Sequence, residues 1–288
     1  MSTAPPPFVF AGVGVEVLLD ANVVWQLPEA FVRHLLAPSA AAAADVVCSV
    51  RLDPGLRGRT QTPEQLAYWR RSPDGLCVTA EEVVLEICQT AERHFAVAAR
   101  VGSNNALPAM LLLLAATVVE LIGGLCLHAT AVELGGEAVL LLGPSGTGKT
   151  TAAQQLGAVR CLANDRVNVI NTSTDPAQAR FEVWSLPIGR PPTLEPSAGV
   201  MLPLGALVRI VQASEPRLRP LHMSEAMLYV REAIEVGVDS GFFEPQRLAA
   251  VGCLAVAAKS GIADVVLGRS WRGELDGFLR PSAPEALS

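Results

Sequence analysis

The first hundred residues alternate between short apolar runs and polar turns. Four of the apolar runs have the length of a strand and lie at residues 8–10, 13–19, 46–52 and 77–79. Two further stretches, at residues 28–36 and 80–98, are expected to be helices. Short strands separated by turn residues, together with two helices, are typical of a mixed α/β module. We therefore predict such a module over residues 1–104.

A long apolar stretch follows at residues 106–127. Its length is close to that of a membrane span, but Pro108 and Glu120 interrupt it and a Gly-Gly pair cuts it near its end. We therefore expect a buried helix over residues 108–121, followed by a strand, and no contact with a membrane.

Beyond residue 127, strand patterns alternate with helix patterns. Two apolar runs at 127–134 and 137–142 flank a Gly-Gly pair and predict a β-hairpin. The other expected strands lie at 160–170, 181–184, 205–211 and 265–268. The expected helices lie at 150–156, 224–235 and 245–260. We assign residues 105–280 to a second, α/β domain and expect residues 281–288 to be a disordered tail.

Composition narrows the classes of function. With 22 Lys and Arg against 28 Asp and Glu, the net charge is −6, so we do not expect a nucleic-acid partner. The six cysteines show no C-x-x-C spacing, which argues against a metal cluster or a disulfide framework. The first seven residues lack the basic and apolar regions of a signal peptide, so we expect a cytoplasmic protein.

Residues 143–150 read Gly-Pro-Ser-Gly-Thr-Gly-Lys-Thr, a complete G-x-x-x-x-G-K-[ST] phosphate-binding loop. A strand pattern precedes it and a helix pattern follows it, which is the context that such a loop requires. Glycines let backbone N–H groups turn towards phosphate oxygens, Lys149 adds positive charge, and the Thr150 hydroxyl is a Mg²⁺ ligand. The alternative is a glycine-rich turn that matches by accident. The expected nucleotide-binding residues are Gly143, Pro144, Ser145, Gly146, Thr147, Gly148, Lys149, Thr150 and Thr151.

The segments on either side of this loop carry a family resemblance. His128 lies on the strand that enters the hairpin, fifteen residues before Gly143, and Asn164-Asp165-Arg166 follows the helix after the loop. In this arrangement residues 120–170, and 180–270 in general layout, resemble the catalytic domain of the HPr serine kinase/phosphorylase family and its kinase relatives. The resemblance implies an α/β P-loop kinase domain of the HPr-kinase/PEP-carboxykinase-like type.

The resemblance also implies a reaction, the transfer of the γ-phosphate of ATP to a hydroxyl group. The acceptor would be a serine of a protein or peptide, or a small molecule, and family members often assemble into oligomers. Thr150 and Asp165 would hold Mg²⁺, and Asp165, His128 and Lys149 would be the catalytic residues. Two alternatives stay open: Asp165-Arg166 as a surface turn, and His128 as a hydrogen-bonded core histidine.

Two arginines are candidates for contact with a phosphate or with the substrate. Arg166 belongs to the acidic motif, and Arg190 follows a glycine in a proline-rich loop. An arginine beside a transferring phosphoryl group stabilises the developing charge. The alternative for Arg190 is a solvated loop side chain.

One position departs from the family pattern. The family has two consecutive aspartates in the acidic motif, and this chain has Asn164 at the first of them. An amide cannot accept a proton, but a general base contributes only about 10²–10⁴-fold, and phosphoryl transfer depends mostly on positioning and charge neutralisation. Three hypotheses follow: a kinase with an altered base, a nucleotide-binding accessory protein without catalysis, and an NTP hydrolase.

Overall fold

The chain divides into two compact units. One consists of Met1–Cys126 with Glu235–Leu248, and the other of Leu127–Ile234 with Ala249–Ser288. The computed structural model describes residues 8–10, 13–24, 37–38, 46–57, 68–72, 75–91, 94–157, 160–164, 166–173, 180–184, 200–234, 244–266 and 269–279. The helix expected at 28–36 and the tail expected from residue 281 lie outside these ranges. The domain boundary expected after residue 104 stays a prediction.

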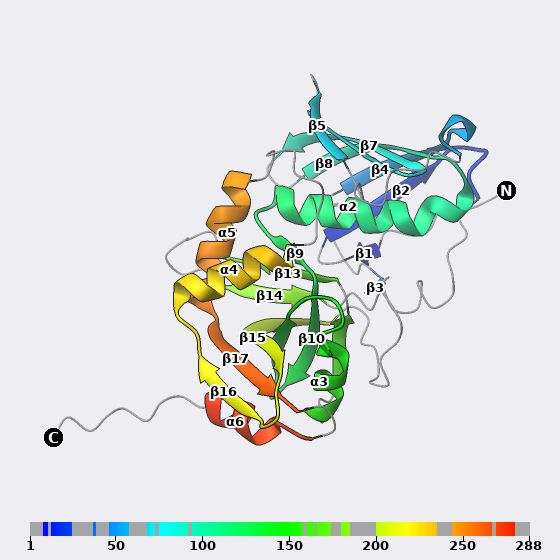
Figure 1. Ribbon diagram of the computed structural model, residues 1–288. Helices are drawn as coiled ribbons and strands as arrows, with labels where there is room; N and C mark the ends of the chain where they lie inside the picture. The colour runs from blue at the N-terminus through cyan, green and yellow to red at the C-terminus, as the bar shows by residue number, and fades with distance from the viewer. Residues whose placement is uncertain are drawn as a thin grey trace. The chain divides into compact units, whose positions relative to one another are not determined.

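The described strands of the first unit form one mixed β-sheet. They are β1 Phe8–Phe10, β2 Val13–Leu19, β3 Ala37–Pro38, β4 Val46–Leu52, β5 Tyr68–Ser72, β6 Gly75–Ala80, β7 Val83–Ala91 and β8 His94–Val101. Their order is β3-β1-β2-β4-β8-β7-β6-β5 (Figure 1). The central strands β2, β4 and β8 run parallel, whereas β1, β7, β6 and β5 pair antiparallel with their neighbours. The predicted strands at 13–19 and 46–52 are confirmed.

The helix expected at residues 80–98 is wrong, because these residues form most of β7 and β8. Exposure in β8 alternates strictly, with Phe95, Val97 and Ala99 buried and the residues between them on the other face. This period of two is the period of a strand. The alanines and glutamates of this segment favour a helix, but the alternation of buried positions and the pairing of β8 with β4 and β7 outweigh that preference.

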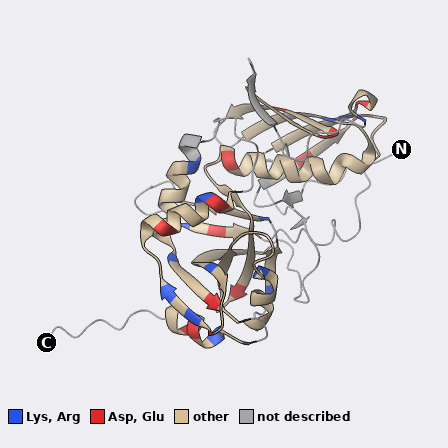
Figure 2. Cartoon of the chain, viewed as in Figure 1, with Lys and Arg blue, Asp and Glu red and all other residues tan. Residues whose placement is uncertain are grey.

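The helix α2 (Leu107–Leu121) confirms the buried helix predicted from the apolar stretch. It lies along one face of the first sheet and contacts β2, β7 and β8 (Figure 1). Residues 104–121 are long and apolar enough to cross a membrane by length and composition, but 56% of them are buried. Burial within the unit therefore accounts for their apolar character. In Figure 2 the helix is tan except for one red turn, and Glu120 is its sole charged residue.

Glu120 is paired inside the first unit. Arg247, at the start of α5 (Glu244–Ala257), donates Nε to Glu120 Oε2 at 2.9 Å and Nη2 to Oε1 at 3.1 Å. The side chains are 1% and 11% exposed, so the pair is withdrawn from water. A forked, buried pair of this kind fixes the start of α5, which belongs to the first unit, against α2.

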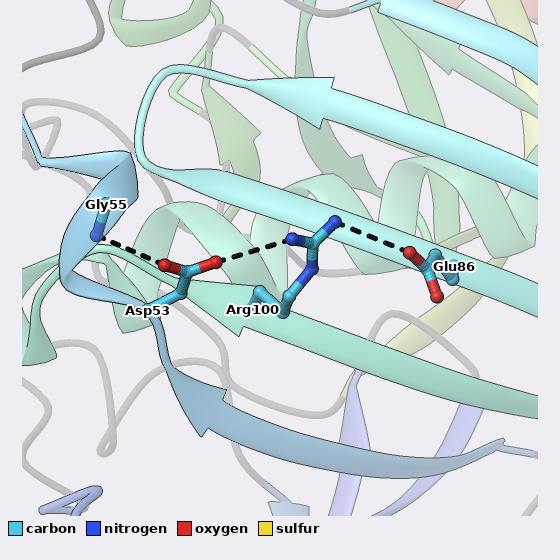
Figure 3. A network of polar contacts seen from close by, with 4 residues as sticks. All are labelled: Asp53, Gly55, Glu86 and Arg100. Carbon is cyan, nitrogen blue, oxygen red and sulfur yellow. Dashed lines mark hydrogen bonds and ion pairs between the residues drawn. The ribbon is translucent and has the colours of Figure 1, made fainter.

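A second, more exposed charge network joins β7 and β8 to Asp53, the residue after the end of β4 (Figure 3). Arg100 lies 3.3 Å from Asp53 and 3.4 Å from Glu86. Asp53 also accepts the backbone N–H of Gly55 at 3.1 Å and thereby caps the short 3-10 helix η1 (Pro54–Leu56). Because all three charged side chains are partly exposed, we expect each ion pair to contribute at most about 1 kcal/mol.

The second unit is built on another mixed sheet. Its described strands are β9 Leu125–Leu127, by which the chain enters the unit, β10 Ala129–Leu134, β11 Glu137–Leu142, β12 Arg160–Asn164, β13 Val167–Asn171, β14 Phe181–Trp184, β15 Met201–Gln212, β16 Arg217–Pro220 and β17 Lys259–Val265. The order is β12-β10-β11-β15-β14-β13-β9, with β17 paired to β15 and β16 paired to β17. β11, β15 and β17 are parallel. The predicted hairpin is confirmed as β10 and β11.

Two helices cover one face of this sheet and set the position of the glycine-rich loop. They are α3 (Lys149–Gln155) and α6 (Arg272–Leu279). Buried residues of both pack with alternate residues of the central strands, including Leu141 and Val208. The buried Trp271 donates its indole N–H to the carbonyl of Ala152 at 3.0 Å. This core holds the first turn of α3 beside the end of β11.

Three details of the second unit differ from the sequence analysis. The strand expected at 160–170 is two strands, β12 and β13, separated at residues 165–166. The helix expected at 245–260 ends at Ala257, and its last two residues open β17, which also lies earlier than the strand expected at 265–268. β16 and α6 were not predicted. The remaining expected helix is confirmed as α4 (Met223–Ala233).

Candidate nucleotide-binding site

The glycine-rich loop joins the end of β11 to the start of α3. Gly143 and Gly148 have φ angles of 152° and 87°, in the region that favours glycine. A Cβ on Gly143 would lie 2.8 Å from Thr147 Oγ1, so a side chain there does not fit without a shift. Thr147 closes the loop by donating its hydroxyl to the carbonyl of Pro144 at 2.8 Å. The loop therefore has a curled backbone at a helix N-terminus, the arrangement that exposes N–H groups to an anion.

Lys149 folds back over this loop. Its ammonium group donates to the carbonyls of Gly143 at 2.8 Å and Pro144 at 3.1 Å, and Nζ lies 2.9 Å from Nε2 of His128. Only 6% of the residue is exposed. An ammonium group carries donors alone, so Nε2 of His128 is the acceptor in this contact. Three acceptors, two of them loop carbonyls, therefore hold the ammonium group of Lys149 against the loop.

His128 lies in the bend between β9 and β10, not on a strand as expected from the sequence, and its backbone is held there by the end of α4. Its backbone N–H donates to the carbonyl of Ala233 at the end of α4, and the preceding Leu127 forms a β-bridge with Ile234. The structure therefore brings together two of the residues expected from the sequence, His128 and Lys149, which are 21 positions apart.

A buried amide connects the first turn of α3 to two strands. Asn164, at the end of β12, accepts through Oδ1 from the hydroxyl of Thr150 at 3.1 Å and from the hydroxyl of Thr130 at 2.9 Å. Asn164 is 5% exposed and Thr130 1%. Thr130 is directly opposite Asn164 in the β10–β12 pairing. The Asn164 oxygen therefore accepts from the Thr150 hydroxyl, as a carboxylate could, but without charge.

The other expected residues are placed less completely. Ser145 and Thr151 are exposed, and Arg166 is half-buried just after the end of β12. Asp165 and Arg190 lie outside the described residues. Their roles as metal ligand, base or phosphate contact stay predictions from the sequence.

Two contacts at the loop were missed by the sequence analysis. Gln212 donates its side-chain amide to the carbonyl of Thr147 at 3.3 Å, from the end of a strand parallel to β11. The signal for it is positional, since the carboxyl ends of parallel strands meet at one edge of a sheet. The second is the hydrogen bond from Thr130, near the start of β10, to Asn164, for which the sequence offers no local signal.

The donor set fits a magnesium nucleotide. Among the described residues, no group of three His, Cys, Asp or Glu side chains is close enough to form a cage for a metal. Mg²⁺ in nucleotide sites is commonly held by one or two protein oxygens with phosphate oxygens and water. The Thr150 hydroxyl donates a hydrogen bond to Oδ1 of Asn164, so its lone pairs are left for a cation.

Comparison with known proteins identifies the family. The family model described as "SynChlorMet cassette protein ScmC" matches residues 105–253, slightly more than half of the 288 residues. The chain belongs to this family. One similar solved structure is the Hpr(Ser) kinase/phosphatase from Coxiella burnetii, with 12% identity over 44% of this chain and 87% of that chain and a TM-score of 0.23. A TM-score this low does not establish a shared fold. No curated protein matches the sequence.

Proposed function

We propose that this protein is an ATP-dependent kinase with a P-loop domain of the HPr-kinase/PEP-carboxykinase-like type. It would transfer the γ-phosphate of ATP to a hydroxyl group, of a serine in a protein or peptide or of a small molecule. The observation that carries the proposal is the arrangement at the start of α3. There the Lys149 ammonium lies under a curled loop beside His128, and the Thr150 hydroxyl is oriented by Asn164.

In this proposal the residues of the site bind the phosphates, accept the proton of the attacking hydroxyl or hold the metal ion. The loop N–H groups and Lys149 bind the phosphates, and phosphate oxygens replace one or more of the present acceptors of Lys149. If the replaced acceptor is His128, its Nε2 becomes available to accept the proton of the attacking hydroxyl. Thr150 would hold Mg²⁺ together with Asp165, and the cation would neutralise phosphate charge. Arg166 and Arg190 are the proposed phosphate or substrate contacts.

We also propose a compartment, a partner and an oligomeric assembly for this protein. ATP and Mg²⁺ are cytoplasmic, and we place the protein in that compartment, with a hydroxyl-bearing acceptor as partner and neither nucleic acid nor membrane required. Assembly of several copies of the chain is part of the same proposal, in keeping with the family resemblance.

Asn164 favours a second candidate, a nucleotide-binding accessory protein. An amide at this position cannot accept a proton, so loss of catalysis with retention of ATP binding is a coherent alternative. An NTP hydrolase is the third. The kinase hypothesis takes precedence because Asn164 keeps the hydrogen bond to Thr150 that positioning requires.

Substitution of Asn164 by aspartate distinguishes these candidates. We expect wild type to transfer labelled γ-phosphate to a serine-containing protein or peptide encoded beside its gene, and Asn164→Asp to change the rate by no more than about tenfold, because phosphoryl transfer rests mainly on positioning. Transfer is followed as acid-stable label on the acceptor. Label transferred by Asn164→Asp alone would support the accessory protein, and release of free phosphate without labelled acceptor would support the hydrolase.

A further inference from the structure

We propose that Thr130 is a positioning residue for the metal-binding hydroxyl of Thr150 and acts through Asn164. This inference rests on the proposed function, because it assumes a magnesium nucleotide at the glycine-rich loop. No phosphate-binding motif contains Thr130, which comes from the strand beside the one that precedes the loop.

The geometry is that of one oxygen between two hydroxyl donors. Oδ1 of Asn164 accepts from Thr130 at 2.9 Å and from Thr150 at 3.1 Å. Thr130 is 1% exposed and lies on β10, which pairs with β11 on one side and with the end strand β12 on the other. The hydrogen bond from Thr130 is therefore shielded from water and comes from a strand paired on both sides, whereas Thr150 is on the helix that must meet the ligand.

The orientation of the Asn164 amide determines where the hydroxyl proton of Thr150 points. A threonine hydroxyl has one proton and two lone pairs, and only the lone pairs can bind a cation. With Oδ1 of Asn164 towards Thr150, the proton is used in the hydrogen bond and the lone pairs are left over. If the amide turned by half a rotation, its N–H₂ would donate to Thr150, and the hydroxyl proton would compete with the cation.

Asn164 needs such a neighbour more than an aspartate would. A carboxylate accepts through both oxygens and attracts a hydroxyl proton in either orientation. An amide accepts through one oxygen only, so its orientation must be held by its surroundings. Thr130 supplies one of the two hydrogen bonds that hold this oxygen in place among the described residues.

The test compares ADP binding with and without Mg²⁺ by titration calorimetry. Thr130→Val removes the hydroxyl and keeps the shape of the side chain. Thr130→Ala also removes the hydroxyl, without placing a methyl group in its position. Thr130→Ser keeps the hydroxyl. Thr117→Val is the matched control, since Thr117 is also buried but donates to the carbonyl of Leu113 within α2. Thermal unfolding is measured for each variant.

We expect wild type, Thr130→Ser and Thr117→Val to share one factor by which Mg²⁺ tightens ADP binding. In Thr130→Val and Thr130→Ala this factor falls by about tenfold, the range found when an outer-shell partner of a metal ligand is removed, while metal-free affinity is unchanged. The inference is overturned if the factor stays at the wild-type value, or if metal-free binding weakens equally. A wild type that gains nothing from Mg²⁺ instead overturns the magnesium site of the proposed function.

Discussion

Replacing Lys149 by methionine is expected to weaken MgATP binding by about 100-fold, which corresponds to about 2.7 kcal/mol. Hydrogen bonds from a charged donor are worth about 1.5–3 kcal/mol, and this ammonium is presented to the loop with its charge shielded from water. Its carbonyl acceptors at Gly143 and Pro144 belong to the loop itself, so removal of the charge takes away the group that phosphates would meet. Titration calorimetry of both proteins gives the ratio.

Lys259, the other lysine of the chain, offers a matched control, because it is remote from Lys149 in sequence and donates to different acceptors. Lys259 donates to the carbonyls of Leu279 at 2.7 Å and Phe278 at 3.4 Å, at the end of α6. Lys259→Met removes the same charge from the protein and is expected to leave MgATP affinity within about twofold, since exposed charges interact weakly over distance in salt. Equal affinities for Lys149→Met and wild type would show that the loop does not bind nucleotide.

Breaking the buried ion pair of the first unit is expected to have the largest effect on stability. Arg247→Leu leaves the Glu120 carboxylate buried without its partner, and a loss of about 3–5 kcal/mol is typical of such a change. The double variant Glu120→Leu/Arg247→Leu is expected to recover most of this loss, because no charge stays buried. Asp276→Asn is the control, since its pair with Arg272 is 42% and 36% exposed and should cost at most about 1 kcal/mol.

The loss in Arg247→Leu is also expected to depend on pH. Burial raises the pKa of Glu120 above its ordinary 4.5, and Arg247 opposes this rise, so removing Arg247 raises the pKa further. The folded protein then binds a proton that the unfolded chain releases. Its stability therefore falls as pH rises from 4.5 through the raised pKa, and the loss is greatest above that pKa. Unfolding measured from acidic to neutral pH tests this; a loss that does not vary with pH would contradict the assignment.

The hairpin, the glycine-rich loop and the helix after it were predictable because each has a local cause. A Gly-Gly pair between apolar runs defines the turn, and the order of glycines, lysine and threonine defines the loop. The buried helix α2 followed from the length of its apolar stretch and from Glu120 within it, which is costly to place in lipid and needs a partner such as Arg247.

The errors arose where a non-local interaction decides the structure. Residues 80–98 contain good helix formers, yet they form most of β7 and β8. These two strands pair with each other, and β8 also pairs with β4. The interruption between β12 and β13 falls at the polar segment Asn164-Asp165-Arg166, and the two strands take different partners, β10 for β12 and β14 for β13.

The site shows the same division between local and non-local information. Lys149 and Thr150 are visible in the motif, but the partnership of Asn164 with Thr130 depends on the register of β10 and β12, which shifts at a bulge one residue further along β10. The bulge has no signal in the sequence that we recognised, and a shift of one residue would move Thr130 to the other face of the sheet. The sequence therefore identified Asn164 as a departure from the family, and the structure supplied the hydroxyls that it binds.

Titration of wild type with ATP in the presence and absence of Mg²⁺, repeated with Asp165→Ala, tests the kinase proposal at its metal site. We expect wild type to bind MgATP about tenfold or more tightly than metal-free ATP, and Asp165→Ala to lose most of this gain because a metal ligand is missing. Binding that is indifferent both to Mg²⁺ and to Asp165 would contradict the kinase proposal at its metal site.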